Sequence, residues 1–141
     1  MKNSLQTLNR IQKFNIDEQR KLLAELINRQ DILYAQLKQL QEAFEQEKEF
    51  ARTNSGLGDF GAYVKRYLQQ RENLEGQIAV LEAKIEHERD VMADMFKEQK
   101  TYEIVDRQRQ ERAEKEAGEK EQKMLDEIGT NSFLKTRKQE N

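Results

Sequence analysis

The only histidine of the chain, His87, lies in the stretch EHERD and is the first place to look for metal chemistry. Glu86, Asp90 and Asp94 lie nearby, and imidazole and carboxylate groups are common zinc ligands. The same spacing recurs on highly charged helices that bind no metal. The apolar pattern described below also turns His87 toward solvent, so we interpret this cluster as a solvated helix face.

The glycines of SGLGDFG, residues 55–61, could cradle a phosphate, but they lack the spacing and the lysine of a phosphate-binding loop and indicate a turn. Cysteine is absent, which removes thiolate metal sites and cysteine nucleophiles. Tyr67, Met92, Met95 and Tyr102 recur at helical spacing, as packing residues do. The sequence therefore predicts no catalytic residue, no metal site and no cofactor, and a protein that acts through binding surfaces.

The composition limits what could position such surfaces. Of 141 residues, 37% are charged, only 35% are hydrophobic, and mean hydropathy is -1.07. Proline is absent and glycine numbers only 6, so few chain reversals are available. A closed core is thus excluded, which leaves either a disordered chain or long helices with a narrow apolar stripe.

Charge and hydropathy also limit the partners. With a formal net charge of -2, the chain is not expected to bind nucleic acid. No apolar run reaches the roughly 18–20 residues of a membrane span, and the first residues lack the apolar core of a secretory signal. We therefore expect an intracellular protein without direct membrane insertion.

Apolar periodicity decides in favour of helices. Steps of three and four residues select one set of positions from Leu23 to Ala51 and another from Phe60 to Tyr102, together called the heptad seam. Seven of nine and ten of thirteen of these positions are apolar, which is typical of a coiled coil. The seam positions are 23, 26, 30, 33, 37, 40, 44, 47 and 51, and then 60, 64, 67, 71, 74, 78, 81, 85, 88, 92, 95, 99 and 102.

The break between the two seams, residues 53–59, predicts a turn, with Asp59 as the N-cap of the following helix. The fold class is therefore all-α: an antiparallel two-helix coiled-coil hairpin with a C-terminal helical overhang. Its helices are expected at about 4–52 and 60–128, within a single unit of residues 1–129. Gly129 is expected to end the second helix, followed by a flexible tail at 130–141. If the hairpin folds about Gly56, residue i faces roughly residue 112 − i.

Beyond Tyr102 the apolar seam ends, and charged pairs spaced i,i+4 are expected to support the helix at ~0.2–0.5 kcal/mol each. These pairs are Glu103 with Arg107, Glu111 with Lys115, Glu116 with Lys120 and Glu119 with Lys123.

Three groups of apolar residues are candidates for contact with a partner. Leu8, Ile11 and Phe14 deviate from the heptad seam, which asks for positions 9, 12 and 16. Either the register shifts locally or these residues face another protein. Tyr63 and Tyr67 make the start of the second helix the most aromatic stretch, where they either pack internally or bind a partner. Met124, Leu125 and Ile128 have no predicted partner within the chain.

The opening SLQTLNRIQKFNIDEQRKLLAEL resembles the N-terminus of the bacterial flagellar export family called FliJ, small cytoplasmic coiled-coil proteins of the type III secretion apparatus. The turn-exit stretch DFGAY and the late QKMLDEI, followed by a basic tail, are similar to that family in order and spacing. The motifs KF-x-x-DEQR and LDEI lie outside the seam and raise the likeness above that of coiled coils in general.

The resemblance implies a hairpin akin to the central stalk of rotary ATPases, which couples the hexameric export ATPase to the membrane export gate. It implies that both free ends enter the ATPase ring, and we assign this contact to Leu8, Ile11, Phe14, Leu125 and Ile128. It also implies that the gate protein meets the early second helix, at Tyr63, Tyr67 and Leu74. Export chaperones are further partners of the family, and docking would hold the protein at the inner face of the cell membrane.

A second hypothesis is a generic coiled-coil scaffold that dimerises through its C-terminal overhang and has no role in export. The residues Leu125 and Ile128 distinguish the two hypotheses. Their replacement by alanine should abolish ATPase binding under the first and self-association under the second.

Overall fold

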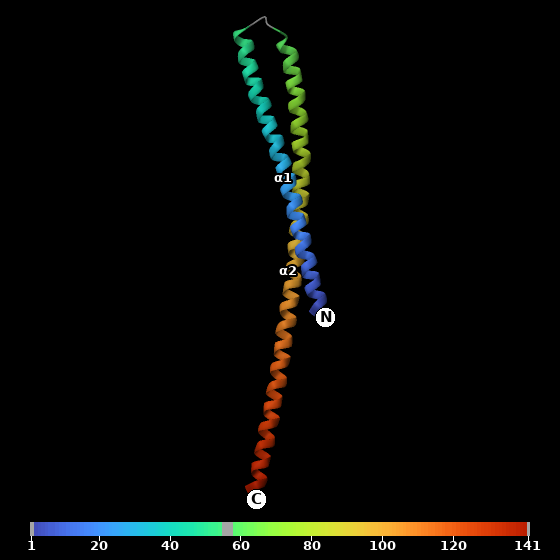
Figure 1. The fold of residues 1–141 in the computed structure, drawn as a ribbon, viewed down its shortest axis with the longest axis vertical. Coiled ribbons are helices and arrows are strands. Elements are labelled where there is room, and N and C mark those ends of the chain that lie inside the picture. Colours follow the sequence, from blue (N-terminus) through green and yellow to red (C-terminus); the bar gives the residue numbers. More distant parts are fainter. Residues whose placement is uncertain (1, 55–57, 141) are drawn as a thin grey trace. The chain divides into compact units, whose positions relative to one another are not determined.

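The computed structural model describes the backbone of residues 2–54 and 58–140 and the side chains of residues 4–54 and 58–138. It contains two helices, α1 (Lys2–Thr53) and α2 (Phe60–Glu140), which pack against each other (Figure 1). The described residues contain no strand. The predicted all-α helical hairpin is confirmed.

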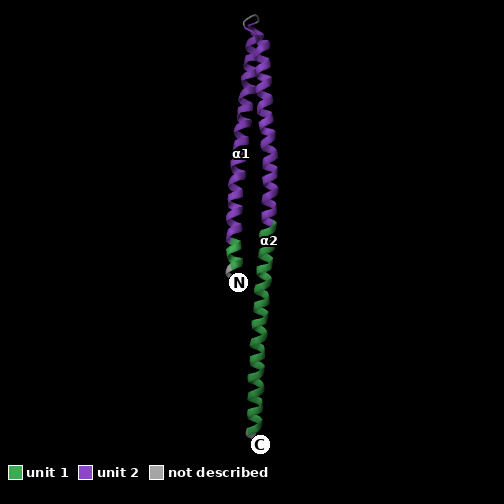
Figure 2. Ribbon diagram, turned by 90° about the vertical axis from the view of Figure 1, so that its right-hand side faces the viewer, with its two compact units in different colours: residues 1–9, 97–141 green, residues 10–96 purple. Residues whose placement is uncertain are grey.

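The chain divides into two compact units (Figure 2). One contains residues 10–96, and the other contains residues 1–9 together with residues 97–141. In the first unit, α1 and α2 lie side by side and antiparallel, so that Gln19 reaches Glu88 and Phe44 reaches Tyr67. This unit holds most of the heptad seam.

The core of the unit 10–96 is the predicted seam. Every seam position from 23 to 95 is buried or half-buried, except Glu47 and Arg71. Ile85 is the most deeply buried side chain, with 1% of its surface exposed, and packs with Leu23 and Leu26. Because two helices bury only a narrow stripe, this line of contacts forms the hydrophobic core among the described residues of the unit.

Two buried glutamines of α1 link the helices by hydrogen bonds. Gln19 Nε2 donates to the Glu88 backbone carbonyl at 3.0 Å and to its carboxylate at 2.5 Å. Gln30 Nε2 donates to Glu82 Oε2 at 2.6 Å, a pair that satisfies the predicted facing of residues i and 112 − i. Polar pairs of this kind satisfy buried amides and favour one register over its neighbours.

The exposed seam residue Arg71 is paired along its own helix. Its Nε donates to Glu75 Oε1 at 2.9 Å, and this hydrogen bond raises the pKa of the Arg71 guanidinium above its ordinary value. Arg71 therefore stays charged and solvated at a position where the heptad pattern asks for an apolar residue.

Aromatic rings fill the space between the helices beside the turn. Phe44 of α1 stacks on Tyr67 with 3.9 Å between ring centroids, and on Phe60 and Tyr63 with 6.2 Å each. The start of α2 thus packs on the end of α1 through rings, which bury more area than aliphatic side chains.

Side-chain caps and a glycine conformation define the described edges of the turn. Asp59 Oδ1 accepts a hydrogen bond from the Ala62 N–H at 3.1 Å, which confirms the predicted N-cap. Gly58 has a φ of 81°, in the left-handed region that favours glycine. Gly56, the predicted centre of the reversal, lies outside the described residues.

The other unit contains the start of α1 and the end of α2. Leu5, Leu8 and Asn9 are half-buried, as are Tyr102, Val105 and Asp106. From residue 107 to residue 138 every side chain is exposed. None of the four predicted i,i+4 ion pairs in this stretch is formed in the structure, so local backbone hydrogen bonding holds it helical without them.

The end of α2 differs from the prediction. The helix passes through Gly129, which lacks the left-handed conformation of a terminating glycine, and continues to Glu140. A glycine with ordinary helical geometry weakens a helix without ending it, and Thr136 Oγ1 hydrogen-bonds back to the Ser132 carbonyl at 3.0 Å. The flexibility of residues 130–141 stays a prediction. None of the described helical segments is long and apolar enough to cross a membrane.

Candidate partner-binding surfaces

The N-terminal part of α1 in the unit 10–96 turns the polar Gln12 inward and the apolar Ile11 and Phe14 outward. Ile16 is buried and Gln12 half-buried, so the heptad seam continues backward without a register shift. Ile11 and Phe14 are therefore turned to solvent, and 63% of Phe14 is exposed. Gln12 Oε1 is buried and has no hydrogen-bond partner, which is unfavourable by about 1–3 kcal/mol for an amide.

Leu8 and Asn9, in the other unit, differ less in exposure than Phe14 and Gln12 do, because both are half-buried. Asn9 holds a seam position, and its Oδ1 is buried without a hydrogen-bond partner. Leu8 is half-buried beside it. Of the three N-terminal residues predicted to meet a partner, Ile11 and Phe14 are thus freely accessible and Leu8 only partly.

The C-terminal part of α2 exposes the third predicted group. Met124, Leu125 and Ile128 all project into solvent, and 59% of Ile128 is exposed. Charged and polar residues precede this patch, and the next exposed apolar residues toward the end of the helix are Phe133 and Leu134. Nothing among the described residues covers it.

The predicted gate residues fall into two kinds. Tyr67 is only 7% exposed, because it packs on Phe44 within the hairpin. Tyr63 and Leu74 are half-buried and accessible from outside. Leu74 also lines a shallow depression between the helices, together with Gln36, Gln39, Leu40, Gln70 and Asn73.

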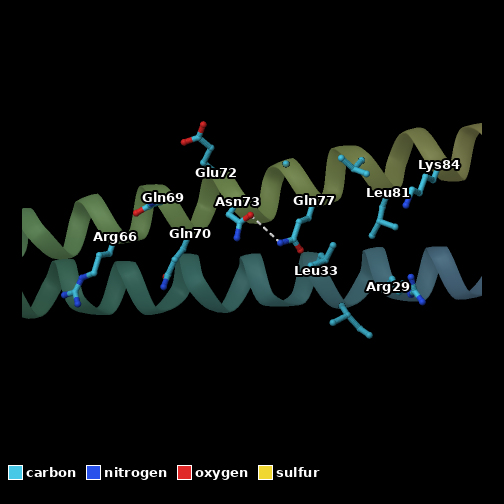
Figure 3. Close-up of a pocket in the computed structure, with 13 residues that line it drawn as sticks. Arg29, Leu33, Arg66, Gln69, Gln70, Glu72, Asn73, Gln77, Leu81 and Lys84 are labelled. Carbon is cyan, nitrogen blue, oxygen red and sulfur yellow. Dashed lines mark hydrogen bonds between the residues drawn. The ribbon is translucent and has the colours of Figure 1, made fainter.

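A larger groove, which the sequence reasoning missed, lies between α1 and α2 in the unit 10–96 (Figure 3). Its volume is about 1210 Å³. Its apolar lining is Ile32, Leu33, Val80 and Leu81, and its polar and small lining is Arg29, Arg66, Gln69, Gln70, Glu72, Asn73, Gly76, Gln77 and Lys84. The α2 residues recur every three to four positions beside the seam, and this second stripe is the signal that could have indicated the groove.

Neither the backbone conformation nor the surrounding side chains require glycine at position 76 in this groove. It has ordinary helical geometry, and a Cβ built on it meets nothing within 4 Å. A glycine inside a helix costs about 1 kcal/mol relative to alanine. The open space at Gly76 therefore leaves the backbone of α2 accessible from the groove.

The predicted solvated face around His87 can be followed in the structure. His87 is exposed, and no group of three or more potential ligands gathers within the described residues. The surfaces available are apolar patches and a groove on helices, which can bind other proteins.

These features define a coiled-coil hairpin protein. The sequence profile described as flagellar FliJ protein matches residues 1–138, and the chain belongs to this family. It is therefore a flagellar export-related protein of a family of non-enzymatic export components. Comparisons with curated proteins and with solved structures give no match.

Proposed function

We propose that the chain couples the hexameric export ATPase to the membrane export gate during flagellar protein export. In this role it acts from the cytoplasm, lies at the inner face of the cell membrane when docked, and catalyses no reaction itself. We also propose that it binds export chaperones, which the family likeness supports but which no residue here locates.

The observation that carries the proposal is the outward placement of Ile11 and Phe14 above a polar seam position. Burying each of them against a partner would contribute about 1.5–3 kcal/mol. Within the hairpin the same positions contribute nothing to the core, because the seam runs through Gln12 and Ile16. We assign the ATPase contact to Ile11 and Phe14, with Leu8 as a partly buried neighbour, and separately to Leu125 and Ile128.

Isothermal titration of the full chain into the hexameric export ATPase tests this assignment. We expect Ile11→Ala with Phe14→Ala, and separately Leu125→Ala with Ile128→Ala, to weaken binding at least tenfold. Phe50→Ala is the matched control, because Phe50 is also about half exposed but lies at the other end of α1. A wild-type chain that does not bind the ATPase would contradict the proposal.

The exposed patch at Met124, Leu125 and Ile128 also supports the second candidate, a scaffold that dimerises through the end of α2. Sedimentation velocity of the purified chain separates the two functions. Under the export proposal the chain is a monomer at micromolar concentration, and the Leu125→Ala, Ile128→Ala variant sediments identically. A wild-type dimer that this variant converts to monomer favours the scaffold.

For the gate we propose a direct contact at Tyr63 and Leu74, with Tyr67 supporting the surface from beneath through Phe44. Leu74→Ala should weaken binding of the cytoplasmic part of the gate protein while the melting temperature of the chain stays within a few degrees. Tyr67→Ala should lower both, because its ring belongs to the hairpin core. Equal gate affinity for wild type and Leu74→Ala would argue against this contact.

A further inference from the structure

Two methionines occupy neighbouring positions of the heptad seam in the part of α2 that packs on residues 12–20 of α1. Met92 and Met95 are both half-buried, and Met92 packs against the core cluster of Leu23, Leu26 and Ile85. A thioether is flexible and polarisable, so it fills the irregular space of a narrow seam. Because the chain contains no cysteine, its thioethers are the sulfur groups that an oxidant can attack.

The seam around these methionines contains few other apolar groups. Gln19 contacts Glu88 across the seam, and the Arg20 guanidinium lies 5.7 Å from the centroid of the Phe96 ring, so the two stretches lie side by side. The seam residues of this stretch are Glu88, Met92 and Met95 on α2 and Gln12, Ile16 and Gln19 on α1. Apolar contact at these seam positions therefore comes from one isoleucine and two thioethers.

Oxidation has different consequences at the two kinds of methionine in this chain. Met124 is 62% exposed, so water can solvate its sulfoxide. At Met92 and Met95 the sulfoxide oxygen is a new polar group inside the seam, where the nearby Gln19 amide already donates to Glu88. A polar group that is buried without a hydrogen bond destabilises the packed state. Since both seam methionines are only half-buried, a small oxidant can reach them.

We propose that Met92 and Met95 form a reversible oxidation site, at which hydrogen peroxide converts the thioethers to sulfoxides and loosens residues 12–19 of α1 from α2. In each step a sulfur lone pair attacks one peroxide oxygen, and the O–O bond breaks. The other oxygen takes the proton of the first and leaves as water, so the sulfur loses two electrons and the peroxide gains them. A methionine sulfoxide reductase reverses the step, because two thiols become a disulfide while the sulfoxide oxygen leaves as water.

The loosening also changes the surface that we assign to the export ATPase. Phe14 faces outward because Gln12 and Ile16 are held inward at the seam. Once this stretch has left α2, the orientation of Phe14 is no longer fixed, and binding must pay a larger conformational entropy. This consequence rests on the proposed function, and it makes the ATPase contact sensitive to peroxide.

Oxidation of the folded full chain with hydrogen peroxide, followed by peptide mass mapping, tests the site. We expect Met124 to gain an oxygen atom first, and Met92 and Met95 to follow. Amide hydrogens of residues 12–19 should then exchange at least tenfold faster, and the melting temperature should fall by about 5 °C or more. Treatment with methionine sulfoxide reductases and a thiol should restore both values.

The matched control is Met92→Leu with Met95→Leu, which conserves volume and leaves Met1 and Met124 to be oxidised. Its melting temperature should stay within a few degrees of wild type, and peroxide should not change its exchange at residues 12–19. Met92→Gln with Met95→Gln introduces a polar group without oxidant and should speed this exchange.

Four results would overturn the oxidation site. The first is that Met92 and Met95 resist peroxide while Met124 is converted. The second is that their oxidation leaves exchange at residues 12–19 unchanged. The third is that the leucine variant responds to peroxide as wild type does, and the fourth is that the reductases do not restore the original exchange.

Titration of the reduced and oxidised chains into the hexameric export ATPase tests the functional consequence. We expect the oxidised chain to bind at least tenfold more weakly, and the leucine variant to bind equally before and after peroxide. Equal affinity of the reduced and oxidised wild type would overturn the regulation of ATPase binding. If the reduced chain does not bind the ATPase, the proposed function fails, whereas hydrogen exchange still decides whether the oxidation site exists.

Discussion

Two stretches of α2 have the same secondary structure and opposite surroundings. Between Phe60 and Phe96 the seam side chains other than Arg71 are buried or half-buried, whereas from residue 107 to residue 138 every side chain is exposed. In the first stretch the helix is stabilised by tertiary packing, and in the second by backbone hydrogen bonds and local propensity alone. An identical substitution should therefore have different consequences in the two stretches.

The largest expected contrast is between Ile85→Ala and Ile128→Ala. Ile85 is 1% exposed in the core, so its truncation should lower the free energy of unfolding by about 2–5 kcal/mol. Ile128 is 59% exposed, so its truncation should change stability by less than about 0.5 kcal/mol. Urea denaturation followed by circular dichroism measures both. Equal losses would mean that the C-terminal stretch is packed in solution.

A smaller effect is expected from Gln30→Leu, which places an apolar residue at a polar seam position. Leucine should add more burial than the Gln30–Glu82 hydrogen bond contributes, raising the free energy of unfolding by about 1 kcal/mol. Glu82 is exposed and can be solvated instead. Disulfide trapping of cysteine pairs placed in neighbouring registers should show more than one pairing in the variant. A destabilised variant would show that the hydrogen bond outweighs burial.

The smallest effect is expected from Gly118→Ala in the exposed stretch. A Cβ at Gly118 meets nothing within 4 Å, so the substitution should stabilise the local helix by about 0.8–1 kcal/mol. Amide hydrogen exchange should slow for residues near 118 and stay unchanged near Ile85. Unchanged exchange near 118 would indicate that another interaction already holds this stretch.

Several features of the fold follow from local pattern. The heptad spacing identified the buried positions of both helices, because a helix that packs on one neighbour must repeat its apolar residues every 3.5 residues. Asp59 was recognisable as an N-cap from its place after the turn, since capping depends on the residues next to it. The absence of a left-handed conformation at Gly129 was not recognisable, because glycine is compatible with both geometries.

The candidate surfaces were harder to predict, because the exposure of their residues depends on the facing helix of the hairpin. The sequence offered two stripes for the start of α1, and it could not choose between packing and exposure for Tyr67. The fold buries Tyr67 against Phe44 and exposes Phe14 above Gln12. The groove at Gly76 was missed because its lining residues come from both helices. Its lining cations could not be recognised as a group from a sequence in which positive and negative charges are balanced.

The sequence by itself determined that the chain is helical, where it turns, and which stripe of each helix is apolar, because these properties arise from residues close together along the chain. Only the tertiary structure decided which apolar residues remain exposed, which amides find partners across the seam, and where cations gather beside an open backbone. Those outcomes depend on the residues that the facing helix supplies at each level, and spacing along one helix carries no information about them.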